Sequence, residues 1–211
     1  MTFIPLRHPS IPIETWGRLL TVGTSTLGHR RDHGFVTDLT PIRRPIRLAG
    51  LALTVQIGEY DAGALTEATE RLEPGHILVV SQVGSGSRAS IGGIVSYMLK
   101  SKGAAGLIID GAITDYDQLL EWGMPVYYRS VSARVTKRLG NEGRVGGTVP
   151  IGGTVISDGD YLFGDSDGIA VLAPEEAADI TASLAEREIE EVNILRRIDE
   201  AKAAKDAGTA A

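Results

Sequence analysis

Apolar residues along the chain follow two periods, which together indicate an α/β domain. Residues 51–56 alternate as a strand does, and the mostly apolar run 76–81 is typical of a buried strand. Between them, residues 64–72 have helical spacing and end at Pro74-Gly75, a pair that favours a turn. We therefore predict two strands joined by a helix in this part of the chain.

The middle of the chain repeats this arrangement more clearly. A helix is predicted from about Ser90 to Lys102, and the apolar run 105–109 predicts a buried strand that ends at Asp110-Gly111. Another short helix is expected at 115–122. Ligands of open α/β sheets bind at the carboxyl ends of the strands, so the polar residues after position 109 are candidates for a site.

The rest of the chain predicts shorter elements. A short helix is expected at residues 13–20, and strands are expected at 125–128, 154–156, 161–163 and 169–172, with a glycine-rich β connection at 140–153. Neither a repeat nor a linker divides the sequence. We therefore expect residues 1–211 to form a single domain.

The C-terminal region predicts a long helix from about residue 174 to 205. It opens with Pro174-Glu175-Glu176, which suits a first helical turn. Its apolar residues form one stripe: Ile180, Leu184, Val192, Leu195 and Ile198. Such a stripe either packs on the helix's own domain or contacts a neighbouring subunit.

Composition and charge argue against several classes of function. A formal net charge of -6 over 211 residues disfavours a nucleic-acid partner, and we interpret the short basic clusters at 29–31 and 43–47 as solvated loop charges. The chain has no cysteine, which excludes disulfides, thiolate catalysis and zinc sites with sulfur ligands. No run of about 18 apolar residues occurs, and residues 1–13 lack an apolar leader. We expect a cytoplasmic protein that binds neither nucleic acid nor membrane.

Two acidic residues mark a candidate site. Asp110 and Asp115 bracket a short turn directly after a buried strand, where carboxylates can face a cleft and hold a hard cation such as Mg²⁺. Alternatively, Asp115 is the N-cap of the helix that begins at Tyr116, and the local pattern taken alone favours this cap.

Three ordered blocks resemble the RraA-like family, which includes 4-hydroxy-4-methyl-2-oxoglutarate aldolases and is named after an inhibitor of an endoribonuclease. The blocks are Gly92–Val95 with 102–115, residues 123–129, and residues 159–169. The resemblance extends over roughly residues 20–200. It implies a swivelling β/β/α domain that assembles as a homotrimer or a dimer of trimers, with sites between subunits.

The resemblance also implies roles for particular residues. In aldolase members, the residue that corresponds to Asp115 helps to hold Mg²⁺ or Mn²⁺, largely through water, and the metal polarises the oxo group of the substrate. Backbone amides at the start of the central helix bind the carboxylate of a 2-oxo acid. These amides correspond to Gly92, Gly93, Ile94 and Val95. A neighbouring subunit's C-terminal helix supplies an acid, for which Glu191 or the adjacent Glu190 is the counterpart.

The chain departs from the family pattern at two positions. Thr114 stands where the family has an arginine before the metal aspartate, so a fixed cation is missing. Gly93 stands where the family often has an acid or an amide. Arg88 lies close before the predicted helix and could supply a guanidinium in place of the missing arginine. The alternative is that Arg88 is a surface arginine in a flexible loop.

Taken together, these observations predict a divalent-metal-dependent C–C lyase that acts on a small oxo-acid or related carboxylate. The predicted catalytic residues are Asp115, Arg88, Thr114 and Glu191. An isomerase or hydratase that uses the same pocket is an alternative, because loss of the arginine affects enolate stabilisation more than metal binding. A non-catalytic, protein-binding regulator of RNA-processing enzymes is an alternative of a different class.

Overall fold

A mixed β-sheet forms the centre of the computed structural model, which describes residues 17–209. Its parallel strands are β3 (Leu48–Ile57), β4 (His76–Gln82), β6 (Gly106–Ile113) and β7 (Val126–Val131). Each of these strands is longer than the apolar run that predicted it. The reason is that pairing with a neighbouring strand continues past the run: β6, for example, still pairs with β7 at Ala112 and Ile113, beyond the polar residue Asp110.

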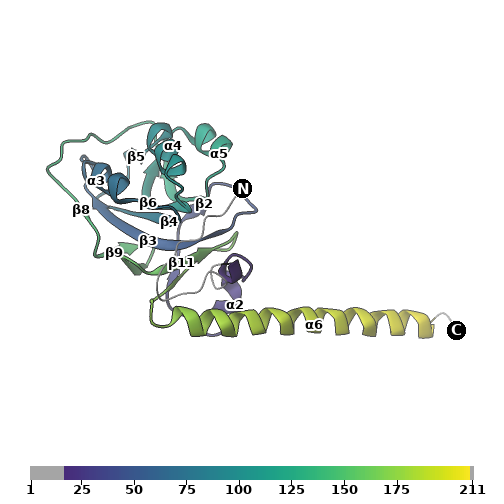
Figure 1. The fold of residues 1–211 in the computed structure, drawn as a ribbon. Coiled ribbons are helices and arrows are strands. Elements are labelled where there is room, and N and C mark those ends of the chain that lie inside the picture. Colours follow the sequence, from purple (N-terminus) through teal and green to yellow (C-terminus); the bar gives the residue numbers. More distant parts are fainter. Residues whose placement is uncertain (1–16, 210–211) are drawn as a thin grey trace.

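Three helices cover one face of the sheet (Figure 1). They are α3 (Ala64–Arg71), α4 (Gly93–Ser101) and α5 (Tyr116–Trp122). Leu65, Leu99 and Leu119, one from each helix, are at most 1% exposed and belong to the same apolar cluster as Val80 and Ile109 of the strands. Because successive side chains of a strand point to opposite faces, the other side chains of these strands form an apolar surface on the second face of the sheet. A second layer covers that surface.

That second layer is a hairpin of β9 (Thr148–Ile151) and β10 (Thr154–Ser157). Val149 and Ile156 of the hairpin share a cluster with Ile77, Val79 and Ile108 of the sheet. The glycines at the turn, Gly152 and Gly153, have positive φ values of 45° and 80°, which explains why two glycines stand there. The β/β/α layering confirms the predicted α/β class.

The first and last described helices meet at the antiparallel edge of the sheet. Here β11 (Tyr161–Gly164) pairs with β3 and β12 (Ile169–Leu172), and β12 pairs with β1 (Phe35–Val36). Against them pack α2 (Thr24–Gly28) and the first turns of α6 (Ala177–Thr209). Figure 1 shows the rest of α6 running past the other elements. Of the helix expected at 13–20, residues 13–16 lie outside the described residues and residues 17–19 are helical.

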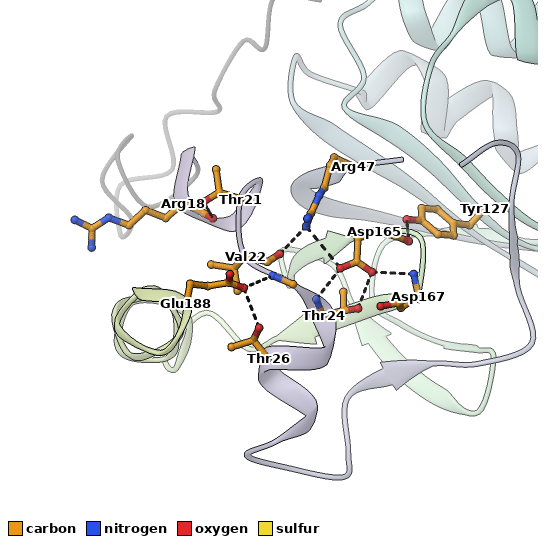
Figure 2. Close-up of polar contacts among 11 residues, drawn as sticks. Arg18, Thr21, Val22, Thr24, Thr26, Arg47, Tyr127, Asp165, Asp167 and Glu188 are labelled. Atoms are coloured by element: carbon orange, nitrogen blue, oxygen red, sulfur yellow. Dashed lines mark hydrogen bonds and ion pairs between the residues drawn. The ribbon is translucent and has the colours of Figure 1, made fainter. Parts of the chain in front are cut away.

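Hydrogen bonds to two carboxylates join α2 to the rest of the fold (Figure 2). The Asp165 carboxylate accepts from the backbone N–H and the hydroxyl of Thr24, at 2.8 and 2.7 Å, and from the N–H of Asp167 at 3.0 Å. Glu188 of α6 accepts from the N–H of Gly23 at 2.8 Å and from the hydroxyl of Thr26 at 2.9 Å. Asp165 therefore anchors α2 to the sheet, while Glu188 anchors it to α6.

Two members of the basic clusters, Arg31 and Arg47, bond to other parts of the fold, so their interpretation as solvated loop charges was wrong. Arg47 donates to the carbonyl of Val22 at 2.8 Å and lies 3.6 Å from Asp165. Arg31 pairs with Glu176 at 2.9 Å, and its side chain is only 11% exposed. Guanidinium groups suit such positions because their fork of donors reaches a carbonyl and a carboxylate at once. Both arginines therefore stabilise the contacts that the segment around α2 makes with the rest of the fold.

The helix predicted from Ser90 begins later than expected. Residues Ala89–Ile91 form the short strand β5, which pairs in parallel with β6, and Gly92 is extended, with φ −133° and ψ −160°. The backbone groups of this segment bond to the end of β6 instead of to a helical turn, which a local helical pattern does not reveal. The remaining short strands are β2 (Thr40–Pro41) and β8 (Arg144–Val145). Among the described helices, none is long and apolar enough to cross a membrane.

Candidate functional site

The end of β6 and the start of α4 lie next to each other. Pairing of β5 with β6 places Ile91 opposite Ile113, and Thr114 N–H donates to the carbonyl of Ile91 at 2.9 Å. The chain enters α4 directly after Ile91 and enters α5 directly after Thr114. Gly92, Gly93 and Asp115 therefore meet at the carboxyl edge of the parallel strands, where α/β sheets bind ligands.

Asp115 turns its side chain toward α4. Its backbone is left-handed, with φ 56° and ψ 40°, and its side chain makes no capping hydrogen bond to α5. Instead Oδ2 accepts from the backbone N–H of Gly93 at 2.7 Å. The interpretation of Asp115 as a side-chain N-cap is wrong, because N-cap residues have extended backbone angles. Aspartate is among the few residues that tolerate the left-handed region.

Gly92 brings the two segments into contact. A Cβ atom on Gly92 would lie 2.5 Å from Oδ2 of Asp115 and 2.6 Å from Cγ2 of Thr114. Real Cβ atoms essentially never come so close to neighbouring atoms. A side chain at position 92 would therefore push the Asp115 carboxylate away from the start of α4.

Only some of the predicted carboxylate-binding amides at the start of α4 are open. The N–H of Gly93 is occupied by Asp115. Among the described residues, no hydrogen bond uses the N–H groups of Ile94 and Val95, as is normal for the first turn of a helix. These two amides, at the positive end of the helix dipole, remain available to an anion.

The side chains at this place suit a hydrated hard cation. Asp115 is exposed, and its Oδ1 lies 3.4 Å from the hydroxyl oxygen of Thr114, so the donors are all oxygens. Residues 17–209 contain no group of three or more His, Cys, Asp and Glu residues that could enclose a metal. Mg²⁺ is often held by one or two carboxylates and several waters. Asp115 therefore fits as a single carboxylate ligand of Mg²⁺ or Mn²⁺.

Asp110 does not join Asp115 in one site. β6 continues to Ile113, so Asp110 lies within the strand rather than after it. Its carboxylate pairs with Arg129 and accepts from the N–H of Gly152 at 2.8 Å. Burial raises the pKa of Asp110, but the bonds from Arg129 and Gly152 outweigh burial and leave that pKa below its ordinary value. Asp110 lines a separate hollow of about 820 Å³ beside the hairpin β9–β10.

Arg88 does not contact the residues around Asp115. Its guanidinium donates to the carbonyl of Val135 at 3.0 Å and lies over the ring of Tyr60, 5.1 Å from the centroid. None of its hydrogen bonds to described residues leads to Thr114 or Asp115. This arrangement differs from both expectations, because Arg88 is neither beside Asp115 nor free in a flexible loop.

Glu191 lies on α6, which packs on a different part of the sheet from α4 and α5 (Figure 1). Both Glu191 and Glu190 pair with Arg187 of the same helix, at 3.3 and 3.1 Å. Within one chain, Glu191 therefore does not reach Asp115. A role for it would require α6 of a neighbouring subunit, as the resemblance implies.

Nothing in the sequence singles out Gln118, which the structure places beside Gly93. A Cβ atom on Gly93 would overlap Oε1 of Gln118 and would lie 3.3 Å from the Trp122 ring. Trp122 in turn packs edge-on against Tyr97, with ring centroids 5.3 Å apart. No sequence signal would have found Gln118, because its position beside Gly93 depends on how α5 packs against α4.

Comparison with known proteins gives matches in sequence. A family model described as "RraA-like: Aldolase/RraA" matches residues 17–171. A Halalkalibacterium halodurans protein named "Putative 4-hydroxy-4-methyl-2-oxoglutarate aldolase" is 32% identical over 141 residues, which are 65% of this chain and 67% of that protein. A protein of the same name from Burkholderia mallei is 32% identical over 142 residues, which are 65% of this chain and 85% of that protein.

Solved structures also match. The Streptomyces coelicolor protein RraAS2, described as an unusual member of the RNase ES inhibitor RraA protein family, is 25% identical with a TM-score of 0.74. The match covers 84% of this chain and 93% of that one. The RNA-processing inhibitor RraA from Thermus thermophilis is 21% identical with a TM-score of 0.62, over 70% of this chain and 89% of that one. At 21% identity, the likeness to the Thermus protein shows a shared fold and no more.

Proposed function

Because this chain belongs to the RraA-like family, we propose that it is a divalent-metal-dependent lyase of the aldolase or decarboxylase type. Its substrate class is a small oxo-acid or related carboxylate. The observation that carries the proposal is the exposed Asp115 carboxylate, held by the N–H of Gly93 beside the open amides of Ile94 and Val95. A cation ligand and an anion-binding helix end thus lie side by side, as an oxo-acid substrate requires.

Each of these residues has a distinct task in the proposal. The amides of Ile94 and Val95 bind the substrate carboxylate, and the helix dipole favours its charge. The N–H of Gly93 fixes one oxygen of Asp115, so the other oxygen would be available to hold a metal ion or a water bound to it. A divalent cation bound at Asp115 supplies Lewis-acid polarisation of a carbonyl oxygen.

The absence of an arginine at position 114 should lower the rate at which the proposed lyase cleaves aldolase substrates. A donor aimed at developing negative charge is worth about 3 to 4 kcal/mol of barrier, and the Thr114 hydroxyl carries no charge. Arg88 could replace it only by leaving Val135. We therefore expect lower activity on standard aldolase substrates than an arginine-containing site would have.

An assay of pyruvate release tests the proposed reaction. Purified protein with Mg²⁺ or Mn²⁺ is expected to release pyruvate from 4-hydroxy-4-methyl-2-oxoglutarate or oxaloacetate, and EDTA should abolish this release. Thr114→Arg should raise the rate, by up to about 10²-fold if the guanidinium reaches the carbonyl. Turnover that EDTA leaves unchanged would contradict metal dependence. Absence of turnover in both proteins would contradict the lyase assignment.

We also propose that the protein assembles as a homotrimer or a dimer of trimers in which α6 contacts a neighbouring subunit. Four apolar residues that follow one another at intervals of three along α6 are exposed by 58–64%: Ile189, Val192, Leu195 and Ile198. A long helix with this many exposed apolar side chains presents apolar surface that a subunit interface would bury. The same contact would bring Glu191 to another subunit's site.

The variant Val192→Glu/Leu195→Glu tests this contact. Buried charges without partners are costly at an interface, so the variant should elute as a smaller species than the wild type in size-exclusion chromatography with light scattering. Both residues are exposed within one chain, so far-UV circular dichroism should change little. Asn193→Glu, which adds a charge at a polar position of the same helix, is the control. An unchanged mass for the double variant would rule out this interface.

A protein-binding regulator is the second candidate function. The likeness to RraAS2, whose family is described by its inhibition of RNase ES, favours it. A regulator acts by contact and needs neither Asp115 nor a metal. Inhibition of an RNase ES-type endoribonuclease by the wild type and by Asp115→Asn to the same degree would support this function, whereas no inhibition by either would exclude it.

A further inference from the structure

Gln118 stands in the part of the site that Gly93 leaves open. It lies in the first turn of α5, three residues after Asp115, and its Oε1 occupies the space in which a Cβ of residue 93 would lie. Oδ2 of Asp115 is 3.4 Å from that same point, and the edge of the Trp122 ring is 3.3 Å from it. The carboxamide is therefore placed between the proposed metal ligand and an aromatic ring.

The hydrogen-bonding groups of Gln118 are available. Its side chain is exposed, and none of the hydrogen bonds among the described residues uses its Oε1 or Nε2. A carboxamide offers two N–H donors and one acceptor, and rotation about its last bond exchanges them. Next to it, the N–H groups of Ile94 and Val95 are also open. Open polar groups of α4 and α5 thus lie on either side of Gly93.

Among the residues that the structure describes, no cationic side chain at this site is free to bind an anion in place of Gln118. Thr114 is neutral, and the Arg88 guanidinium bonds to Val135. Lys100 of α4 donates instead to the carbonyl of Trp122 at 2.7 Å. Hydrogen bonds from neutral donors to a charged acceptor are still worth more than bonds between two neutral groups.

We propose that Gln118 is a specificity-determining residue of this site, whose carboxamide binds the carboxylate or oxo oxygen of the substrate beside the amides of Ile94 and Val95. This inference rests on the proposed function and adds to it a side chain that binds the substrate. Gly93 is required because any side chain there displaces the carboxamide.

Calorimetric titration of the purified protein with oxalate, in the presence of Mg²⁺, tests the role of Gln118. Oxalate is the probe because it has two oxygen-bearing groups on adjacent carbons. Gln118→Ala should weaken oxalate binding about tenfold, and Gln118→Glu should weaken it more, because it adds a like charge. Titration with Mg²⁺ alone should show no loss of metal affinity in Gln118→Ala. Glu121→Gln, an exposed position of the same helix, should bind oxalate as the wild type does.

Gly93→Ala supplies an independent test that leaves Gln118 in the chain. The new Cβ displaces the carboxamide, whose flexible side chain can move aside, and alanine suits a helix better than glycine does. Oxalate binding should weaken in Gly93→Ala, and adding Gln118→Ala should weaken it little further, since both changes remove one contact. Oxalate affinity within twofold of wild type in Gln118→Ala would overturn this inference alone. Failure of the wild type to bind either Mg²⁺ or oxalate would overturn the proposed function with it.

Discussion

Asp115→Asn is expected to lower metal-dependent turnover by about 10²-fold or more and to remove the rise in melting temperature caused by Mg²⁺ or Mn²⁺. The substitution deletes the negative charge that attracts the cation. It preserves the local geometry, because asparagine tolerates the left-handed backbone of this position and can still accept from the N–H of Gly93. Without metal, the free energy of unfolding should change by less than about 1 kcal/mol.

The comparison of Asp115→Asn with Asp117→Asn separates metal binding from general charge effects. Asp117 is an exposed carboxylate in the first turn of α5, two residues after Asp115. Asp117→Asn changes the net charge equally and should retain turnover and the metal-induced thermal shift. If Asp115→Asn keeps both properties as well, Asp115 does not bind the metal.

The periodicity of apolar residues identified the main elements, because burial imposes a pattern on both helices and strands. It misplaced the start of α4, since the strand β5 is defined by pairing with β6, which is distant in sequence. It also ended β6 too early, at the first polar residue, Asp110. That carboxylate is accommodated inside the strand by Arg129 and Gly152, two partners far along the chain.

The candidate site was only partly predictable for a similar reason. The motif brought Gly92 and Asp115 together as one candidate site, and the two residues do lie side by side because both belong to one short α/β unit. The direction of the Asp115 side chain depends on its left-handed backbone, which a sequence pattern does not specify. An exposed glutamine such as Gln118 has no characteristic pattern, since its position beside Gly93 follows from the packing of α5 against α4. Glu191 requires a second subunit to take part at all.

Asp165→Asn should have the largest effect on folding stability, with a loss of about 2 to 4 kcal/mol in the free energy of unfolding. Asp165 is only 7% exposed, and each of its oxygens accepts from a backbone N–H. Asparagine has one acceptor oxygen, so either orientation directs an NH₂ group at the N–H of Thr24 or at that of Asp167. Asp167 supplies the control. Its side chain is exposed, so Asp167→Asn should change the free energy of unfolding little.

The pH dependence of this loss identifies its cause. Burial raises the pKa of Asp165, but bonds from Thr24, the Asp167 amide and Arg47 outweigh burial, so its pKa is lower in the folded protein than in the unfolded chain. Such a group contributes its stability above its unfolded pKa of about 3.9 and loses it as the pH falls through the lower, folded value. In urea unfolding, the difference in the free energy of unfolding between wild type and Asp165→Asn should be largest at pH 7 and should decrease below about pH 4. A gap that does not change between pH 7 and pH 3 would show that the charge of Asp165 is not what anchors α2.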